Sequence, residues 1–435
     1  MSKVIYRTVD GNKGSVYYGQ KFHLRLSGGR KLLDMSSSAG FACLGYTNPY
    51  IKNHIEEQLW NIPYAFSGFW STDTAERAAE RIAEDFDKVK PGWFGKCIFL
   101  QTGSEAVDLA CKLTVQCHME AGEQRLYFIA RDHSFHGVGL LPSMLSGKYP
   151  RYGMLDPYHQ ALVNGGDNHV THCWHPYDKG SKESLRCMQD SSMKWTAAII
   201  VEPVSGPSLG AYVEIREYMQ GLRDICDQNG SLLIYDEVLC GAGRCGYMST
   251  AEMYGVWPDI VILGKAISAG YQPVSVICLS EKVVDRIRKG SGRIMFGTTY
   301  SAHTMGCAAV EATLAYIRAN DLMKKVRGDR LLDKISDYLD LPVVKDVRGT
   351  GHLIGIEFRD PATDRFFDPE IEFYAKARDA IMALGAVVYA KGGTVWGKGD
   401  FMTVMPPYEM DDETIDQGLS MVRQGIETAY EQVKK

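Results

Sequence analysis

The feature that most limits the possible folds is a repeated alternation of short apolar runs and helix-like stretches through the middle of the chain. Each run has four or five residues without regular polar alternation; the runs are 126–130, 197–201, 232–235, 260–263 and 274–278. Buried parallel strands have this continuous character, whereas half-exposed strands alternate. Stretches with helical periodicity include 74–86, 104–120 and 217–229. The alternation predicts an α/β domain in which helices flank a mainly parallel sheet.

The C-terminal part of the sequence has a different pattern. It predicts a pair of short strands, a helix, a further strand and a terminal helix, at 346–358, 370–384, 401–404 and 412–433. A chain of 435 residues is also too long for one compact core. We therefore expect residues 55–325 to form a large domain and residues 326–435 a smaller α+β domain, with residues 1–54 joining the smaller one.

Composition excludes several classes of function. The net charge is −5 and no basic stripe occurs, which argues against a nucleic-acid or anionic-membrane surface. The N-terminus has no apolar core of a secretory signal, and no run approaches the roughly 18 apolar residues of a membrane span. The 11 cysteines are scattered without a C-x-x-C pair. This usage predicts reduced thiols in a cytoplasmic protein.

Two charged residues stand at the ends of predicted buried strands. Lys265 follows the run 260–263 and Gly264. A lysine at this edge of a parallel sheet points into the crevice where ligands bind, and a desolvated amine can form an imine with a carbonyl. A solvated loop lysine is the alternative. Asp236 follows the run 232–235 and can hold a protonated heterocyclic nitrogen. A Mg²⁺ role for Asp236 would need a G-x-x-x-x-G-K-[ST] loop, which the sequence lacks.

Two further segments can contact a phosphorylated ring. Thr102–Ser104 stands between a predicted strand end and a helix, where free N–H groups and hydroxyls suit a phosphate. An ordinary helix N-cap, with Glu105 in the first turn, is the alternative. Phe135, beside His136 and Gly137, can stack on a flat ring or pack in the core.

These segments, in this order, resemble those of the class III aminotransferases, which are pyridoxal-5′-phosphate (PLP) enzymes of fold type I. The resemblance extends from Leu33 to Pro407. The matching motifs are Thr102-Gly103-Ser104-Glu105-Ala106, Phe135-His136-Gly137, Glu202-Pro203, Asp236-Glu237-Val238, Gly241-Ala242-Gly243-Arg244, Pro258-Asp259, Gly264-Lys265-Ala266, Gly297-Thr298-Thr299-Tyr300-Ser301 and Arg348-Gly349-Thr350-Gly351.

The resemblance implies a complete cofactor site. Lys265 would carry PLP as a Schiff base and act as general base, and Asp236 would keep the pyridine nitrogen charged. The implied cofactor-binding set is Thr102, Gly103, Ser104, Phe135, His136, Glu202, Asp236, Val238, Lys265 and Thr299. Thr299 would come from the second subunit of a homodimer with shared active sites. Phe135 and Val238 would enclose the ring.

The implied reaction is a ping-pong transfer of an amino group. The donor would be an amine or ω-amino compound, with an amino sugar among the candidates, and the acceptor a keto acid or aldehyde. An aminomutase, an epimerase or decarboxylase on the same fold, and a non-catalytic PLP-binding protein are the alternatives.

The sequence departs from the family where a substrate carboxylate is expected. Ornithine-type members have an Arg at the position of Thr403, and the segment 387–400 contains Lys391 and Lys398 but no Arg. A guanidinium is the natural bidentate partner of a carboxylate, so its loss favours an amine-like substrate. The substrate-contacting candidates are Phe69 and Trp70 in an aromatic segment, Arg244 and Lys391. Glu202 would help to orient the substrate or Arg244.

A histidine-rich segment gives a competing signal. His169, His172, Cys173 and His175 are all metal-ligand types. Their spacing has no helical period and matches no standard zinc site. We expect this segment to be a loop over the large domain and expect no metal.

Overall fold

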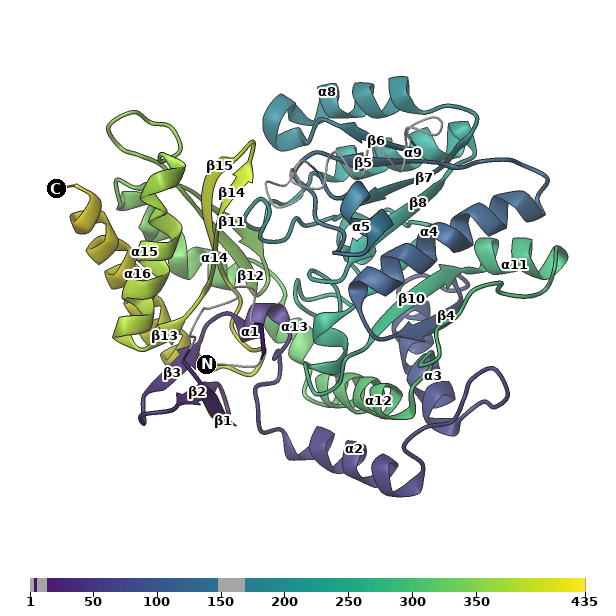
Figure 1. Cartoon of the computed structure of the whole chain (residues 1–435), viewed down its shortest axis with the longest axis horizontal. Helices are drawn as coiled ribbons and strands as arrows, with labels where there is room; N and C mark the ends of the chain where they lie inside the picture. Colours follow the sequence, from purple (N-terminus) through teal and green to yellow (C-terminus); the bar gives the residue numbers. More distant parts are fainter. Residues whose placement is uncertain (1–3, 6–13, 148–168, 435) are drawn as a thin grey trace.

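The computed structural model describes residues 4–5, 14–147 and 169–434, and it has two lobes that lie side by side (Figure 1). The large lobe surrounds a seven-stranded sheet, and the small lobe surrounds a four-stranded sheet from the C-terminal part of the chain. A further four-stranded sheet, formed mostly by the N-terminal segment, lies beside the small lobe. Among the residues described, no helix is both long and apolar enough to cross a membrane.

The sheet of the large lobe is mainly parallel, which confirms the predicted fold class. Its order is β4 (Phe94–Leu100), β10 (Ser275–Ser280), β9 (Ile260–Leu263), β8 (Leu232–Glu237), β7 (Thr196–Val201), β5 (Tyr127–Arg131) and β6 (Val170–Cys173). Strand β10 runs opposite to the other six strands of this sheet. The connection from β9 to β10, residues 264–274, contains a short 3-10 turn at Lys265–Ser268 and no crossover helix, and the chain reverses there.

Helices cover both faces of this sheet (Figure 1). Alternate residues of a strand reach opposite faces, so that Ile199 and Ile200 of β7 belong to different cores. The core on one face contains residues of α2 (Pro49–Asn61), α3 (Asp73–Asp87), α9 (Arg216–Asn229) and α12 (Thr304–Ala319), with α2 packed against α12. The core on the other face contains residues of α4 (Gly103–Glu120), α5 (Leu140–Leu145) and α11 (Glu281–Lys289). The predicted helices at 74–86, 104–120 and 217–229 are therefore present. Helix α9 ends at Gly230, which has the left-handed conformation of a C-cap with φ +79°.

The small lobe is built on an antiparallel sheet. Its order is β11 (Val344–Thr350), β12 (Leu353–Phe358), β15 (Lys398–Val404) and β14 (Tyr389–Val395), and its helices are α14 (Arg330–Ile335), α15 (Phe373–Leu384) and α16 (Asp412–Val433). The predicted hairpin and terminal helix are present. The predicted helix 370–384 is wrong at its start, because Glu372 is left-handed with φ +48° and separates a short 3-10 turn from α15.

The N-terminal segment contributes to the small lobe. Strand β3 (Lys31–Asp34) pairs in parallel with β13 (Ala386–Val387), and Leu33 and Met35 belong to the apolar core of this lobe. Strands β1 (Val16–Gln20) and β2 (His23–Leu26) extend the same sheet. The domain boundaries at residues 54 and 325 stay predictions.

Candidate active site

A cavity of about 380 Å³ lies at the ends of the central strands of the large lobe, where a mainly parallel sheet places its ligands. Nine of the ten predicted cofactor-binding residues line it: Thr102, Gly103, Ser104, Phe135, His136, Glu202, Asp236, Val238 and Lys265. They are spread over more than 160 residues of the sequence, from Thr102 to Lys265, and the fold brings them together. Thr299 is the one member of the predicted set that does not line this cavity.

Lys265 lies at the centre of the site. It follows β9 and Gly264, and its backbone has a left-handed φ of +42°, a strained conformation for a residue with a side chain. Burial lowers the pKa of Lys265, and the nearby carboxylates of Asp236 and Glu202 oppose this shift. A lysine with a lowered pKa offers more of the neutral amine that attacks a carbonyl. The geometry therefore suits an imine-forming lysine and not a solvated loop lysine.

Asp236 is the last but one residue of β8 and projects into the same cavity. Its Oδ2 lies 2.8 Å from Nδ1 of His136, and its Oδ1 accepts a hydrogen bond of 3.2 Å from the backbone N–H of Val238. The Nε2 atom of His136 is buried and has no hydrogen-bond partner among the residues described. A carboxylate has additional lone pairs, so Asp236 can still accept a proton-bearing ring nitrogen.

The N-terminus of α4 forms a cradle that can receive a phosphate. Thr102 and Glu105 make a reciprocal capping box: Thr102 Oγ1 accepts from Glu105 N at 3.2 Å, and Glu105 Oε2 accepts from Thr102 N at 2.9 Å. The capping alternative is thus also true of Thr102. A side chain at Gly103 would place its Cβ 3.0 Å from Val238, so glycine keeps the cradle open. A helix N-terminus with a glycine approach matches what a phosphate needs.

Glu202 connects two sides of the cavity. It follows β7, its Oε2 accepts a 2.9 Å hydrogen bond from the N–H of Phe135, and its Oε1 accepts one of 3.0 Å from Gly206. Burial raises the pKa of Glu202, while these N–H donors and His136 oppose the shift. The carboxylate therefore fixes the segment of Phe135, the predicted ring-stacking residue. Lysine, carboxylate, stacking ring and phosphate cradle together fit PLP.

Comparison with known proteins agrees with this geometry. A family model described as aminotransferase class-III matches residues 12–426. The chain belongs to the class III aminotransferases. It is therefore a PLP-dependent enzyme of the transaminase type, and its fold is that of the fold type I enzymes, as predicted.

Similar proteins cover nearly the whole aminotransferase chain. The uncharacterized aminotransferase YodT of Bacillus subtilis is 29% identical and covers 99% of this chain and 97% of its own. An omega-aminotransferase of Caulobacter vibrioides is also 29% identical, with coverages of 91% and 89%. Among solved structures, an amine transaminase from an uncultivated Pseudomonas species, in its PLP-bound form, has a TM-score of 0.85 at 25% identity, covering 99% of this chain and 97% of its own.

Arg244 of the aminotransferase does not lie in the cavity. It is fully buried, and its guanidinium donates to the carbonyl oxygens of Pro406 at 2.9 Å and of Gly40 and His352 at 3.3 Å each. The expectation that Glu202 orients Arg244 does not match this geometry. The contacts of Arg244 instead join the N-terminal segment, the large lobe and the small lobe.

The other substrate candidates lie outside the cavity wall. Phe69 and Trp70 are 78% and 69% exposed, and neither lines the cavity of its own chain. Lys391 is on β14 of the small lobe, with Nζ 6.0 Å from the ring centroid of Phe135. It is the candidate whose side chain approaches a cavity-lining residue.

Several residues that line the cavity were missed by sequence reasoning, among them Phe41 and Pro207. Phe41 lies in the N-terminal segment and Pro207 lies in the loop after β7. Neither belongs to a polar motif, and an apolar residue outside a motif gives no signal that separates a pocket wall from a core. Only the assembled fold shows their position.

The histidine-rich segment is not a loop, which corrects the prediction. Residues Val170–Cys173 form β6 and pair in parallel with β5, while His175 caps α8 (Pro176–Ser191) by accepting a 3.1 Å hydrogen bond from Tyr177 N. His172 Nε2 lies 3.3 Å from the carbonyl oxygen of Leu145. Within the described part of the chain, no group of three or more His, Cys, Asp or Glu residues is placed to hold a metal ion.

Proposed function

We propose that this aminotransferase transfers an amino group from an amine or ω-amino donor to a keto acid or aldehyde acceptor, with Lys265 as the lysine that holds PLP. The observation that carries the proposal is the set of positively charged side chains that line the cavity. Lys265 is the only lysine among its described lining residues, and no arginine lines it. A bidentate carboxylate receiver is therefore missing from this side of the site.

The environment of Thr403 supports the same substrate class. Thr403 is buried, and its hydroxyl donates a 3.3 Å hydrogen bond to the carbonyl oxygen of Tyr389. It therefore does not replace the arginine of the ornithine-type enzymes. The remaining walls include the apolar side chains of Phe41, Pro207 and Leu239. These surfaces favour an amine whose substituent is uncharged near the reacting carbon.

The residues of the chain divide the chemical work. Bound PLP supplies an electron sink for the charge that develops on the substrate carbon. Asp236 would keep the ring nitrogen protonated, and the Nζ of Lys265 would take the proton from the substrate carbon and deliver it to C4′ of the cofactor. Gly103 and Ser104, at the start of α4, would hold the phosphate. Phe135, fixed by Glu202, would cover one face of the ring and Val238 the other.

We also propose a homodimer in which Thr299 completes the partner's site. Thr299 accepts a 2.6 Å hydrogen bond from the hydroxyl of Tyr64 but lies outside its own cavity. Strongly exposed aromatic side chains occur in the same part of the sequence as Tyr64, at Trp60, Phe69 and Trp70. Large exposed apolar residues of this kind mark interaction surfaces. The molar mass by light scattering tests this proposal: a monomer at micromolar concentration would contradict it.

We propose a cytoplasmic location on the evidence of the thiols. All 11 cysteines are free and most are buried. Burial raises the pKa of several, for example that of Cys226 to about 12, which keeps them unreactive. Such thiols suit a reducing compartment.

The variant Lys265→Ala tests the catalytic proposal. The wild-type protein loaded with PLP should show a visible absorption band that an amine donor removes and a keto acid restores. Lys265→Ala should lose this cycle, with turnover reduced at least about 10³-fold, as expected when a general base is lost. Lys96→Ala is the matched control because Lys96 is exposed on β4. Retention of the cycle in Lys265→Ala would contradict the proposal, and turnover without any acceptor would indicate an aminomutase.

A further inference from the structure

The loop that connects β7 to α9, residues 202–214, is buried along most of its length. Loops usually run over the surface, because a buried loop leaves backbone polar groups without partners. Four residues of this loop line the cavity: Glu202, Val204, Gly206 and Pro207. The loop is therefore a wall of the active site, and its conformation depends on the groups that bind its backbone.

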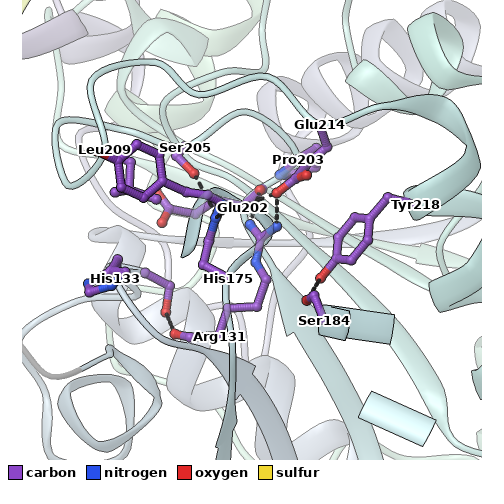
Figure 2. A network of polar contacts seen from close by, with 12 residues as sticks. Arg131, His133, His175, Ser184, Glu202, Pro203, Ser205, Leu209, Glu214 and Tyr218 are labelled. Atoms are coloured by element: carbon purple, nitrogen blue, oxygen red, sulfur yellow. Dashed lines mark hydrogen bonds and ion pairs between the residues drawn. The ribbon is translucent and has the colours of Figure 1, made fainter. Parts of the chain in front are cut away.

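The base of the loop is held by Arg131 (Figure 2). Arg131 ends β5 and is fully buried; its Nη2 donates to the carbonyl oxygen of Glu202 at 2.5 Å, and its Nη1 forms an ion pair with Glu214. One guanidinium thus binds both ends of the loop. A 2.9 Å hydrogen bond from Ser205 N to Tyr212 O then joins the two arms.

The tip of the loop is held by the small lobe. Arg348 of β11 donates from Nη2 to the carbonyl oxygen of Leu209 at 2.7 Å. Its Nη1 lies 2.6 Å from Glu357 Oε2 and 2.6 Å from Asp346 Oδ2. Tyr212 of the loop also contacts Arg348, with the guanidinium carbon 5.7 Å from its ring centroid. The guanidinium therefore connects a loop of the large lobe to two carboxylates of the small-lobe sheet.

Apolar packing follows the same path. Leu209 is fully buried in a cluster with Val395 and Phe401, which belong to β14 and β15. Gly210 and Gly355 pack backbone to backbone, so tightly that a Cβ at Gly355 would lie 1.9 Å from the carbonyl oxygen of Gly210. The tip of the loop has little room to move unless the small lobe moves with it.

We propose that Arg348 is a positioning residue that makes the cavity wall at Gly206 and Pro207 follow the position of the small lobe. Substrate selectivity would then be set from outside the cavity, through Arg348, Leu209 and the arms of the loop. The guanidinium suits this role because it binds Glu357 and the carbonyl of Leu209 at once, which a lysine ammonium does with poorer geometry. The effect on substrates rests on the proposed transamination, whereas the effect on the loop does not.

Hydrogen exchange of the full-length, PLP-loaded protein tests the effect on the loop. The variant Arg348→Gln should speed amide exchange in peptides from 203–213 about tenfold, as expected when a charge-assisted hydrogen bond is lost. Arg348→Lys should fall between this variant and wild type. Arg359→Gln is the matched control, because Arg359 pairs with Asp364 at the surface of the small lobe. Equal exchange in Arg348→Gln and Arg359→Gln would overturn the proposal, as would a uniform rise across the small lobe, which would indicate a purely structural role.

Steady-state kinetics test the effect on substrates. Arg348→Gln should raise KM for the amine donor about tenfold and change kcat less, while the visible band of bound PLP is retained. A wild-type KM in Arg348→Gln would overturn the proposal. If the wild-type protein transfers no amino group, the proposed function is contradicted. The hydrogen-exchange measurement on residues 203–213 would still test the effect of Arg348 on the loop.

Discussion

The floor and the wall of the cavity are built in different ways. The floor consists of Asp236, Val238 and Lys265, which lie at the ends of the neighbouring strands β8 and β9. The wall consists of the loop 202–214, whose two arginine partners are remote in sequence: Arg131 is 83 residues from Glu214, and Arg348 is 139 residues from Leu209. Local sequence places the floor, and the assembled fold places the wall. If the wall sets selectivity as proposed, substitutions in the floor and in the wall should change rate and selectivity separately.

The floor should be the part where one substitution has the largest effect on rate. Replacing Asp236 by Asn keeps the shape but removes the negative charge that holds a ring nitrogen protonated. We expect kcat to fall about 10³-fold, within the range for losing a proton-transfer partner, with little change in KM. Steady-state kinetics measure this, with the exposed Asp227→Asn as control. A changed KM with an unchanged kcat would show that Asp236 affects substrate binding in the way expected of the wall, and would contradict the comparison.

A residue beneath the floor should affect stability and not selectivity. Asp259 precedes β9 and is buried, and it accepts from Leu233 N at 2.9 Å, Arg223 Nη1 at 2.8 Å and Lys282 Nζ at 2.8 Å. The variant Asp259→Asn removes the buried negative charge that faces Arg223 and Lys282 and should cost about 2 kcal/mol at pH 7, because charge-assisted hydrogen bonds are weakened while Arg223 keeps its ion pair with Asp227. Urea unfolding measures the loss. A larger change in KM than in kcat for Asp259→Asn would contradict the prediction that Asp259 affects stability and not selectivity.

The effect of Asp259 should depend on pH in a stated direction. Although its own burial acts the other way, the cations Arg223 and Lys282 and the N–H donor hold the pKa of Asp259 below its ordinary value of 3.8. A carboxyl with a depressed folded-state pKa stabilises the fold above its unfolded pKa, and this contribution is lost as the pH falls through the folded value. The difference between wild type and Asp259→Asn should therefore stay constant from pH 7 to 5 and shrink below about pH 4. A difference that grows in acid would contradict this account.

The same contrast explains which features could be predicted from the sequence. The strands and the motifs around Lys265, Asp236 and Gly103 are local patterns, so their places and their common cavity could be anticipated. The reversed direction of β10 depends on its connection to β9, and the strand β6 depends on pairing with β5. The apolar pattern of the sequence shows neither. The role of Arg131 could not be predicted from the sequence. An arginine at a strand end can be seen to hold the two ends of a loop only when the fold places Glu202 and Glu214 beside it.

The smallest effect is expected outside the cavity wall, at Lys391. Its Nζ lies 6.0 Å from the ring centroid of Phe135, and the residue is half-buried on β14. If this ammonium receives the carboxylate of a keto acid, Lys391→Ala should raise KM for keto acids about fivefold, as expected for a partly screened ion pair. KM for aldehyde acceptors should stay unchanged.

The exposed Lys398→Ala on β15 is the control for Lys391→Ala. Higher salt should weaken keto-acid binding in the wild type and in the Lys398 variant, but less in Lys391→Ala, because the attraction that salt screens is then gone. An equal rise of KM for both classes of acceptor would show that Lys391 supports Phe135 by packing and not by charge. In the homodimer proposed above, the carboxylate receiver would then be expected from the partner subunit, and selectivity would depend on both subunits.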